Sequence, residues 1–133
     1  MIRETYNAHP YQRIIMQHVI EHDRCSIWAG MGLGKTVSVL TALQYLYDTG
    51  LETRPTLILA PLRVARTVWP AEAAKWNHLS LNVVPLLGSP RERRAALHVK
   101  AHVYVMNYEN LEWLIAERAD WPFGIVIADE STK

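Results

Sequence analysis

The residues best suited to chemistry form a glycine-rich stretch, Ala29-Gly30-Met31-Gly32-Leu33-Gly34-Lys35-Thr36. With Ala in place of the first Gly, this stretch fits the phosphate-binding loop pattern. Its glycines let the backbone curl and bring N–H groups close to phosphate oxygens. Lys35 can reach the β- and γ-phosphates, and the hydroxyl of Thr36 can ligate Mg²⁺. The stretch therefore predicts a site for ATP and Mg²⁺, in which residues 30–36 bind the nucleotide and Lys35 also assists catalysis.

A second candidate is the acidic pair Asp129-Glu130, which directly follows the apolar run Ile125-Val126-Ile127-Ala128. Because Mg²⁺ takes oxygen ligands and keeps several waters, one carboxylate often suffices to hold it. We expect Asp129 to ligate the metal and Glu130 to orient or deprotonate the attacking water. Taken alone, the pair is equally typical of a strand end that turns into solvent. The presence of the phosphate loop in the same chain favours the metal site.

The segments around these residues have the periodicity of alternating strands and helices. The loop lies between an apolar run at 25–28 and a helical pattern at 37–47, for which Gly50 is a plausible stop. Ser89-Pro90-Arg91-Glu92 has the form of a capping box, and Pro70 must kink or restart the helix that contains it. The other expected strands are 56–60, 81–85, 103–106 and 124–128, and the other expected helices are 9–23, 64–76, 90–98 and 107–118, the last capped by Asn107.

Short apolar strands that alternate with amphipathic helices indicate an α/β fold, a parallel sheet with helices on both faces. Ligands of such sheets bind beyond the carboxyl ends of the strands. Both the phosphate loop and Asp129-Glu130 follow a strand. We therefore expect them to lie side by side, although they are far apart in the sequence.

The composition sets broad limits on the kind of protein. The 133 residues suffice for one domain, or part of one, and half of them are hydrophobic. A net charge of +1 gives no general attraction to nucleic acid, so any such site must be a local patch. The single cysteine, Cys25, permits no internal disulfide and suits a reducing compartment. With no apparent leader or membrane span, we expect an intracellular protein, cytoplasmic or nucleoid-associated, without a membrane partner.

Three further patterns have competing interpretations. The amide of Gln12 could match the N6 and N7 edge of adenine, or it could face solvent on a helix. His18-Val19-Ile20-Glu21-His22 fits a zinc-protease pattern, but the pattern is short and we do not favour it. The third pattern is a cluster of basic residues. Because a capping box lies within this cluster, we interpret the cluster as a solvated helix face and not as a nucleic-acid patch. The cluster consists of Arg91, Arg93, Arg94 and Lys100.

Taken together, five segments in order resemble the N-terminal half of a superfamily 2 helicase motor, specifically the Swi/Snf-type DNA translocases. The resemblance covers nearly the whole chain and implies a RecA-like lobe that spans residues 1–133. It also implies adenine recognition by Gln12 and contacts to double-stranded DNA from Arg63, Asn107 and Tyr108. The five segments are His9-Pro10-Tyr11-Gln12, residues 31–36, residues 59–64 with Trp69, Glu72 and Trp76 beyond them, Met106-Asn107-Tyr108-Glu109, and Asp129-Glu130.

The chain departs from the family pattern at two places. Ala29-Gly30 stands where Asp-Glu is usual, and Thr132 stands where a histidine usually links the ATP state to the rest of the motor. Motors of this family continue with a further strand and a second lobe, which supplies an arginine to the ATP site. We therefore expect a piece of a longer protein, a first lobe that is incomplete at its C-terminal end. Its missing C-terminal motor lobe would be a partner, and the piece alone would bind ATP without hydrolysing it.

Two other functions remain open on the residues alone. The same loop serves small phosphotransferases and metabolic ATPases, and a nucleotide-gated binding module would need no turnover at all. The segment around Gln12 and the tryptophan-containing segment after Pro61 favour the DNA motor.

Overall fold

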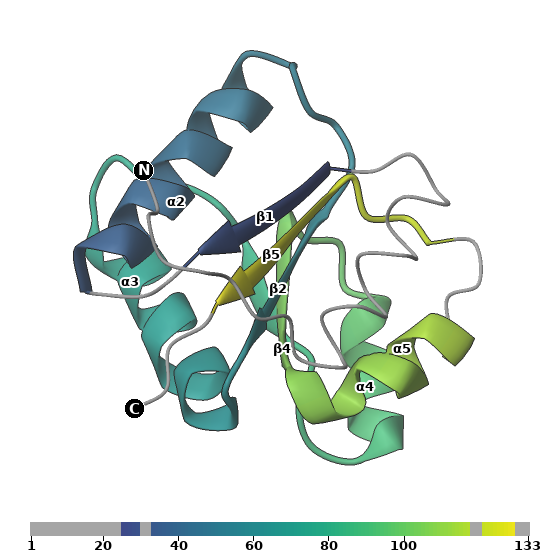
Figure 1. Ribbon diagram of the computed structural model, residues 1–133. Helices are drawn as coiled ribbons and strands as arrows, with labels where there is room; N and C mark the ends of the chain where they lie inside the picture. Colours follow the sequence, from purple (N-terminus) through teal and green to yellow (C-terminus); the bar gives the residue numbers. More distant parts are fainter. Residues whose placement is uncertain (1–24, 30–32, 118–120, 130–133) are drawn as a thin grey trace.

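A parallel sheet forms the centre of the molecule (Figure 1). The computed structural model describes residues 25–29, 33–117 and 121–129. Within them, five strands lie in the order β1-β5-β2-β4-β3, and every neighbouring pair is parallel. The α/β prediction is therefore confirmed. The strands are β1 (Cys25–Ala29), β2 (Thr56–Ala60), β3 (Val83–Pro85), β4 (Val103–Asn107) and β5 (Ile125–Asp129).

Helices cover both faces of the sheet, as the alternating pattern predicts (Figure 1). Helices α2 and α3 pack on one face, and α4 and α5 pack on the other. Among the described residues, no helix combines the length and apolar character needed to cross a membrane. The helix predicted at 9–23 lies outside the described residues. The helical segments are α2 (Leu33–Asp48), η1 (Val64–Val68), α3 (Trp69–Lys75), α4 (Pro90–Leu97), η2 (Tyr108–Asn110) and α5 (Leu111–Glu117).

Strand β2 shows why the expected strands are nearly continuous apolar runs in the sequence. All five of its residues are buried, because successive side chains enter opposite cores. Ile58 and Ala60 pack with α2 and α3 in one core. Leu57 and Leu59 pack with α4 and α5 in the other. A strand covered on both faces can therefore carry no polar alternation.

The helix predicted at 64–76 is interrupted at Pro70, as expected. Proline has no N–H, and its ring clashes with the carbonyl four residues earlier in an α-helix. The π-helical segment η1 precedes it, and the N–H of Trp69 donates to the carbonyl of Val64, five residues earlier. Helix α3 then starts with Pro70 in its first turn, where no N–H is needed.

Two element predictions differ from the structure. The strand expected at 81–85 is only Val83–Pro85, and Leu81 is buried just before it. The prediction that Asn107 caps a helix is wrong, because its side chain makes no cap bond and a 3₁₀ turn separates it from α5. The amide of Asn107 instead donates to Glu109, 2.8 Å away, and its oxygen accepts from Asn110, also 2.8 Å away. Short polar side chains compete for local bonds in this way.

The capping box at Ser89 is confirmed. The hydroxyl of Ser89 accepts from the N–H of Glu92 at 3.2 Å, and the carboxylate of Glu92 accepts from the N–H of Ser89 at 2.8 Å. The bonds from Ser89 hold the pKa of Glu92 below its usual value. Helix α2 also ends as predicted, since Gly50 follows it with a φ of +75°.

The basic cluster is not the uniformly solvated face that we predicted. Arg93 is buried, its guanidinium lies 4.6 Å from the ring centre of Trp113, and it donates to the carbonyl of Gly88 at 2.6 Å. Arg94 pairs with Glu117 of α5 at 2.9 Å. Both arginines join α4 to α5, and Arg93 also bonds to the turn that precedes α4. The fold therefore uses part of the cluster for packing, because a stacked guanidinium can be buried where a hydrated ammonium cannot.

Candidate nucleotide-binding site

The segments that the sequence predicts to bind nucleotide and metal begin at the carboxyl edge of the sheet. Strands β1 and β5 are neighbours, and Ala29 pairs in register with Asp129. The glycine-rich stretch begins with Ala29, so its first residue lies beside Asp129, while residues 30–32 and 130 lie outside the described residues. Ala60 of β2 pairs with Asn107 of β4 at the same edge. The residues after β2 and β4 therefore begin at the same edge as the acidic end of β5.

Thr36, in the first turn of α2, has a buried hydroxyl without a hydrogen-bond partner among the described residues. The residue is 1% exposed, and its Oγ1 has no hydrogen-bond partner among the residues that the structure describes. A buried polar atom left without a partner costs about 1–3 kcal/mol. A bound cation would satisfy this oxygen.

Asp129 is fully buried at the end of β5 and is held from two directions. The indole N–H of Trp69 donates to its Oδ2 at 2.9 Å. The hydroxyl of Tyr108 donates to its backbone carbonyl at 2.8 Å. A buried carboxylate is costly unless it accepts hydrogen bonds, so the bond from Trp69 offsets part of that cost. The bond from Tyr108 holds the backbone of the same residue.

The donor atoms at this edge fit Mg²⁺. A hydroxyl oxygen and a carboxylate are ligands of the kind that this hard cation takes, with water and substrate phosphates completing its shell. Thr36 and Asp129 would hold the ion, which would supply positive charge beside the phosphates. No group of three or more His, Cys, Asp or Glu able to hold a metal occurs within the described ranges.

Several predicted site residues lie wholly or partly outside the described residues. Leu33 and Gly34 open α2, and Lys35 follows them in its first turn. The side chains of these three residues lie outside what the structure describes, as do Gln12, Gly30, Met31, Gly32 and Glu130. Their assigned roles stay predictions.

The three predicted DNA contacts differ in how their side chains are used. Arg63 is exposed just after β2. Asn107 is buried and bonded to its own turn, through Glu109 and Asn110. Tyr108 is half-buried, with its hydroxyl on Asp129. Only Arg63 presents a charged group to solvent.

Sequence reasoning missed the role of Trp69. It was noted as part of a segment, yet its indole contacts a carboxylate 60 positions away. One signal was available: a tryptophan within an apolar helix face needs a partner for its N–H, and the nearest polar strand end is a candidate. The sequence alone could not choose among such ends.

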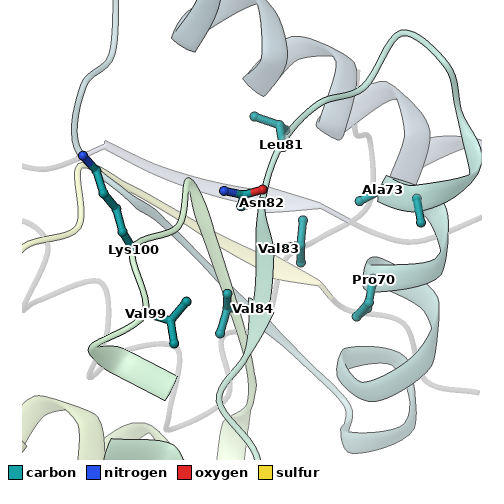
Figure 2. Close-up of a pocket in the computed structure, with 9 residues that line it drawn as sticks. Pro70, Ala73, Leu81, Asn82, Val83, Val84, Val99 and Lys100 are labelled. Carbon is teal, nitrogen blue, oxygen red and sulfur yellow. The ribbon is translucent and has the colours of Figure 1, made fainter. Parts of the chain in front are cut away.

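Measurable cavities lie away from this edge. One of about 350 Å³ is lined by Pro70 and Ala73 of α3 and by β3 (Figure 2). Another of about 660 Å³ lies near Tyr47, Arg54 and His102, beside the amino ends of β2 and β4. Neither is lined by a residue that the sequence assigned to nucleotide or metal.

A strand that leads into a glycine-rich stretch lies beside an acidic strand end in a parallel sheet covered on both faces, the arrangement of a RecA-like lobe. Comparison with known proteins gives the particular family. Residues 15–133 match the SNF2-related domain, and the chain belongs to this family.

Individual relatives agree with the family match. The chain is 52% identical over 133 residues to protein p41 of Acyrthosiphon pisum secondary endosymbiont phage 1, a match over 98% of this chain and 29% of p41. It is 36% identical over 90 residues to the transcription regulatory protein SNF2 of Saccharomyces cerevisiae, covering 67% of this chain and 5% of that protein. It is 30% identical over 102 residues to the ATP-dependent helicase brm of Drosophila melanogaster, covering 72% and 6%. The chain thus spans less than a third of each of these relatives.

Proposed function

We propose that this chain is the ATP-binding part of an ATP-dependent motor that moves along double-stranded DNA. The observation that carries the proposal is the pairing of Ala29 with Asp129, which joins the phosphate-loop strand to the acidic strand end. The buried, unpartnered hydroxyl of Thr36 supports a bound cation at this edge. Membership of the SNF2-related family, with a relative named an ATP-dependent helicase, supports the motor.

Each site residue then has a defined task. The backbone of residues 30–36 cradles the phosphates at the positive end of α2, and Lys35 neutralises the β- and γ-phosphates. Thr36 and Asp129 hold Mg²⁺, which supplies charge stabilisation during phosphoryl transfer. Glu130 orients or deprotonates the attacking water.

The DNA track would run along the same edge of the sheet. Arg63 is exposed after β2, where its guanidinium can pair with a phosphate. The side chains of Asn107 and Tyr108 are occupied within the protein, so this turn would contribute mainly backbone groups. Such contacts position a duplex without reading its sequence. The motor would bind DNA in the cell, and a C-terminal motor lobe would be the partner of this chain.

Measuring ATP turnover by this chain followed by the second motor lobe that the proposal requires tests the proposal. Added duplex DNA should raise the rate of phosphate release severalfold, since both lobes would then bind the track. A rate that depends on a small acceptor molecule, and not on DNA, would identify a phosphotransferase or metabolic ATPase instead. Nucleotide binding without turnover under any condition would indicate a binding module.

Gln12→Ala should weaken binding of ATP but leave binding of GTP unchanged. Only adenine offers the N6 and N7 edge that a Gln amide matches, and such a bidentate pair is worth about 1–3 kcal/mol. Competition titrations with both nucleotides measure the difference, with Gln17→Ala as a control on a second glutamine of the same predicted helix. Equal losses for ATP and GTP would remove Gln12 from base recognition.

A further inference from the structure

The buried contact between Trp69 and Asp129 joins two segments that the sequence treated separately. Both residues have no exposed surface, and the indole Nε1 lies 2.9 Å from Oδ2 of the carboxylate. A hydrogen bond to a charged acceptor is stronger than a neutral one, and the low dielectric of the interior strengthens it further. The contact therefore restricts the orientation of the carboxylate.

The local backbone explains why Trp69 lies where it can make this contact. Segment η1 contains one residue more per hydrogen-bonded turn than an α-helix, and it ends on the N–H of Trp69. Each residue of an α-helix turns the direction of the side chain by about 100°. The extra residue therefore changes the direction in which the side chain of Trp69 points. Pro70 has no N–H, so it prevents this turn from forming the hydrogen bonds of an ordinary α-helix.

A second contact fixes the backbone beneath the same carboxylate. The hydroxyl of Tyr108, from the 3₁₀ turn after β4, donates to the carbonyl of Asp129 at 2.8 Å. The side chain and the main chain of Asp129 are thus held by different elements.

We propose that Trp69 is a positioning residue, which orients the carboxylate of Asp129 for Mg²⁺. This inference rests on the proposed function of the site in binding Mg²⁺ with a nucleotide. Groups that hydrogen-bond a metal ligand fix its rotamer, and their removal typically lowers metal affinity by about 10–100-fold. Trp69 would act on the metal through Asp129 and would touch neither nucleotide nor metal.

The test compares ATP affinity with Mg²⁺ and with EDTA, by calorimetry, in the wild-type chain and in Trp69→Phe. Phenylalanine keeps an aromatic ring in the core and loses the N–H. We expect the enhancement of ATP affinity by Mg²⁺ to fall by about 10–100-fold, while affinity in EDTA stays within about twofold. Trp76→Phe is the matched control, because the indole of Trp76 donates to Glu72 at 3.0 Å on the surface, at the opposite end of α3. It should change neither affinity.

A spectroscopic measurement on the wild-type chain needs no variant to fold. The indole N–H resonance of Trp69 should shift when Mg²⁺ is added to the ATP-bound chain, and the resonance of Trp76 should not. A wild-type Mg²⁺ enhancement retained in Trp69→Phe would overturn the inference. Equal losses with Mg²⁺ and with EDTA, or an unmoved Trp69 resonance, would also overturn it. A wild-type chain that binds no Mg-ATP would contradict the proposed function itself.

Discussion

Replacing Lys35 by Ala is expected to lower the affinity for Mg-ATP by at least about 100-fold while the fold is retained. A hydrogen bond to a charged group contributes about 1.5–3 kcal/mol, and this lysine would contact two phosphates. A loss of about 3 kcal/mol corresponds to roughly 100-fold in Kd. Lys35 lies in the first turn of α2, where the helix end also favours an anion.

Calorimetric titration of Mg-ATP into both chains measures this effect, with circular dichroism as the check on folding. Lys100→Ala provides the control, because Lys100 is exposed before β4, at the opposite edge of the sheet. We expect this control to bind as the wild type does. Unchanged affinity in Lys35→Ala would mean that the phosphates bind elsewhere.

The isolated 133-residue chain is expected to bind ATP and to release phosphate at no more than about 10⁻² per second, with or without duplex DNA. A typical enzyme turns over about 10 times per second. The arginine that a second lobe supplies in related motors contributes about 10³ to 10⁵ of such a rate. Removing that factor leaves roughly 10⁻² to 10⁻⁴ per second.

Steady-state phosphate release by the purified chain, with Glu130→Gln as control, decides this prediction. A basal rate near the detection limit, equal in both proteins, agrees with it. Turnover near one per second that disappears in Glu130→Gln would show a site complete within these residues. That result would favour the small phosphotransferase or metabolic ATPase.

Much of the fold could be predicted because local signals and tertiary packing agree. All five residues of β2 are buried, so its sequence has no helical periodicity and is correctly predicted as a strand. The capping box at Ser89 and the proline at position 70 fix helix starts through local bonds and sterics. The shared edge of Ala29 and Asp129 followed from one rule about parallel sheets. These features depend on residues near one another in the chain, or on the sheet as a whole.

Other features depend on distant side chains that no local pattern reveals. Asn107 has the chemistry of a helix cap, but its neighbours offer better-placed partners and it bonds within its turn. Arg93 looked like a solvated charge, yet Trp113 provides a ring for it to stack upon. Trp69 meets Asp129 only because the fold brings the start of α3 to the end of β5. Each case needs knowledge of the fold before the partner can be named.

The most direct test of the central claim is whether Thr36 and Asp129 hold one metal ion. A double-mutant cycle with Thr36→Val and Asp129→Asn measures the enhancement of ATP affinity by Mg²⁺ in all four proteins. Valine removes a buried hydroxyl that has no partner in the described part of the chain, so stability should not fall. We predict that each single variant loses most of the enhancement and that the double variant loses no more than either. Full enhancement in Asp129→Asn, or losses that simply add, would contradict the account.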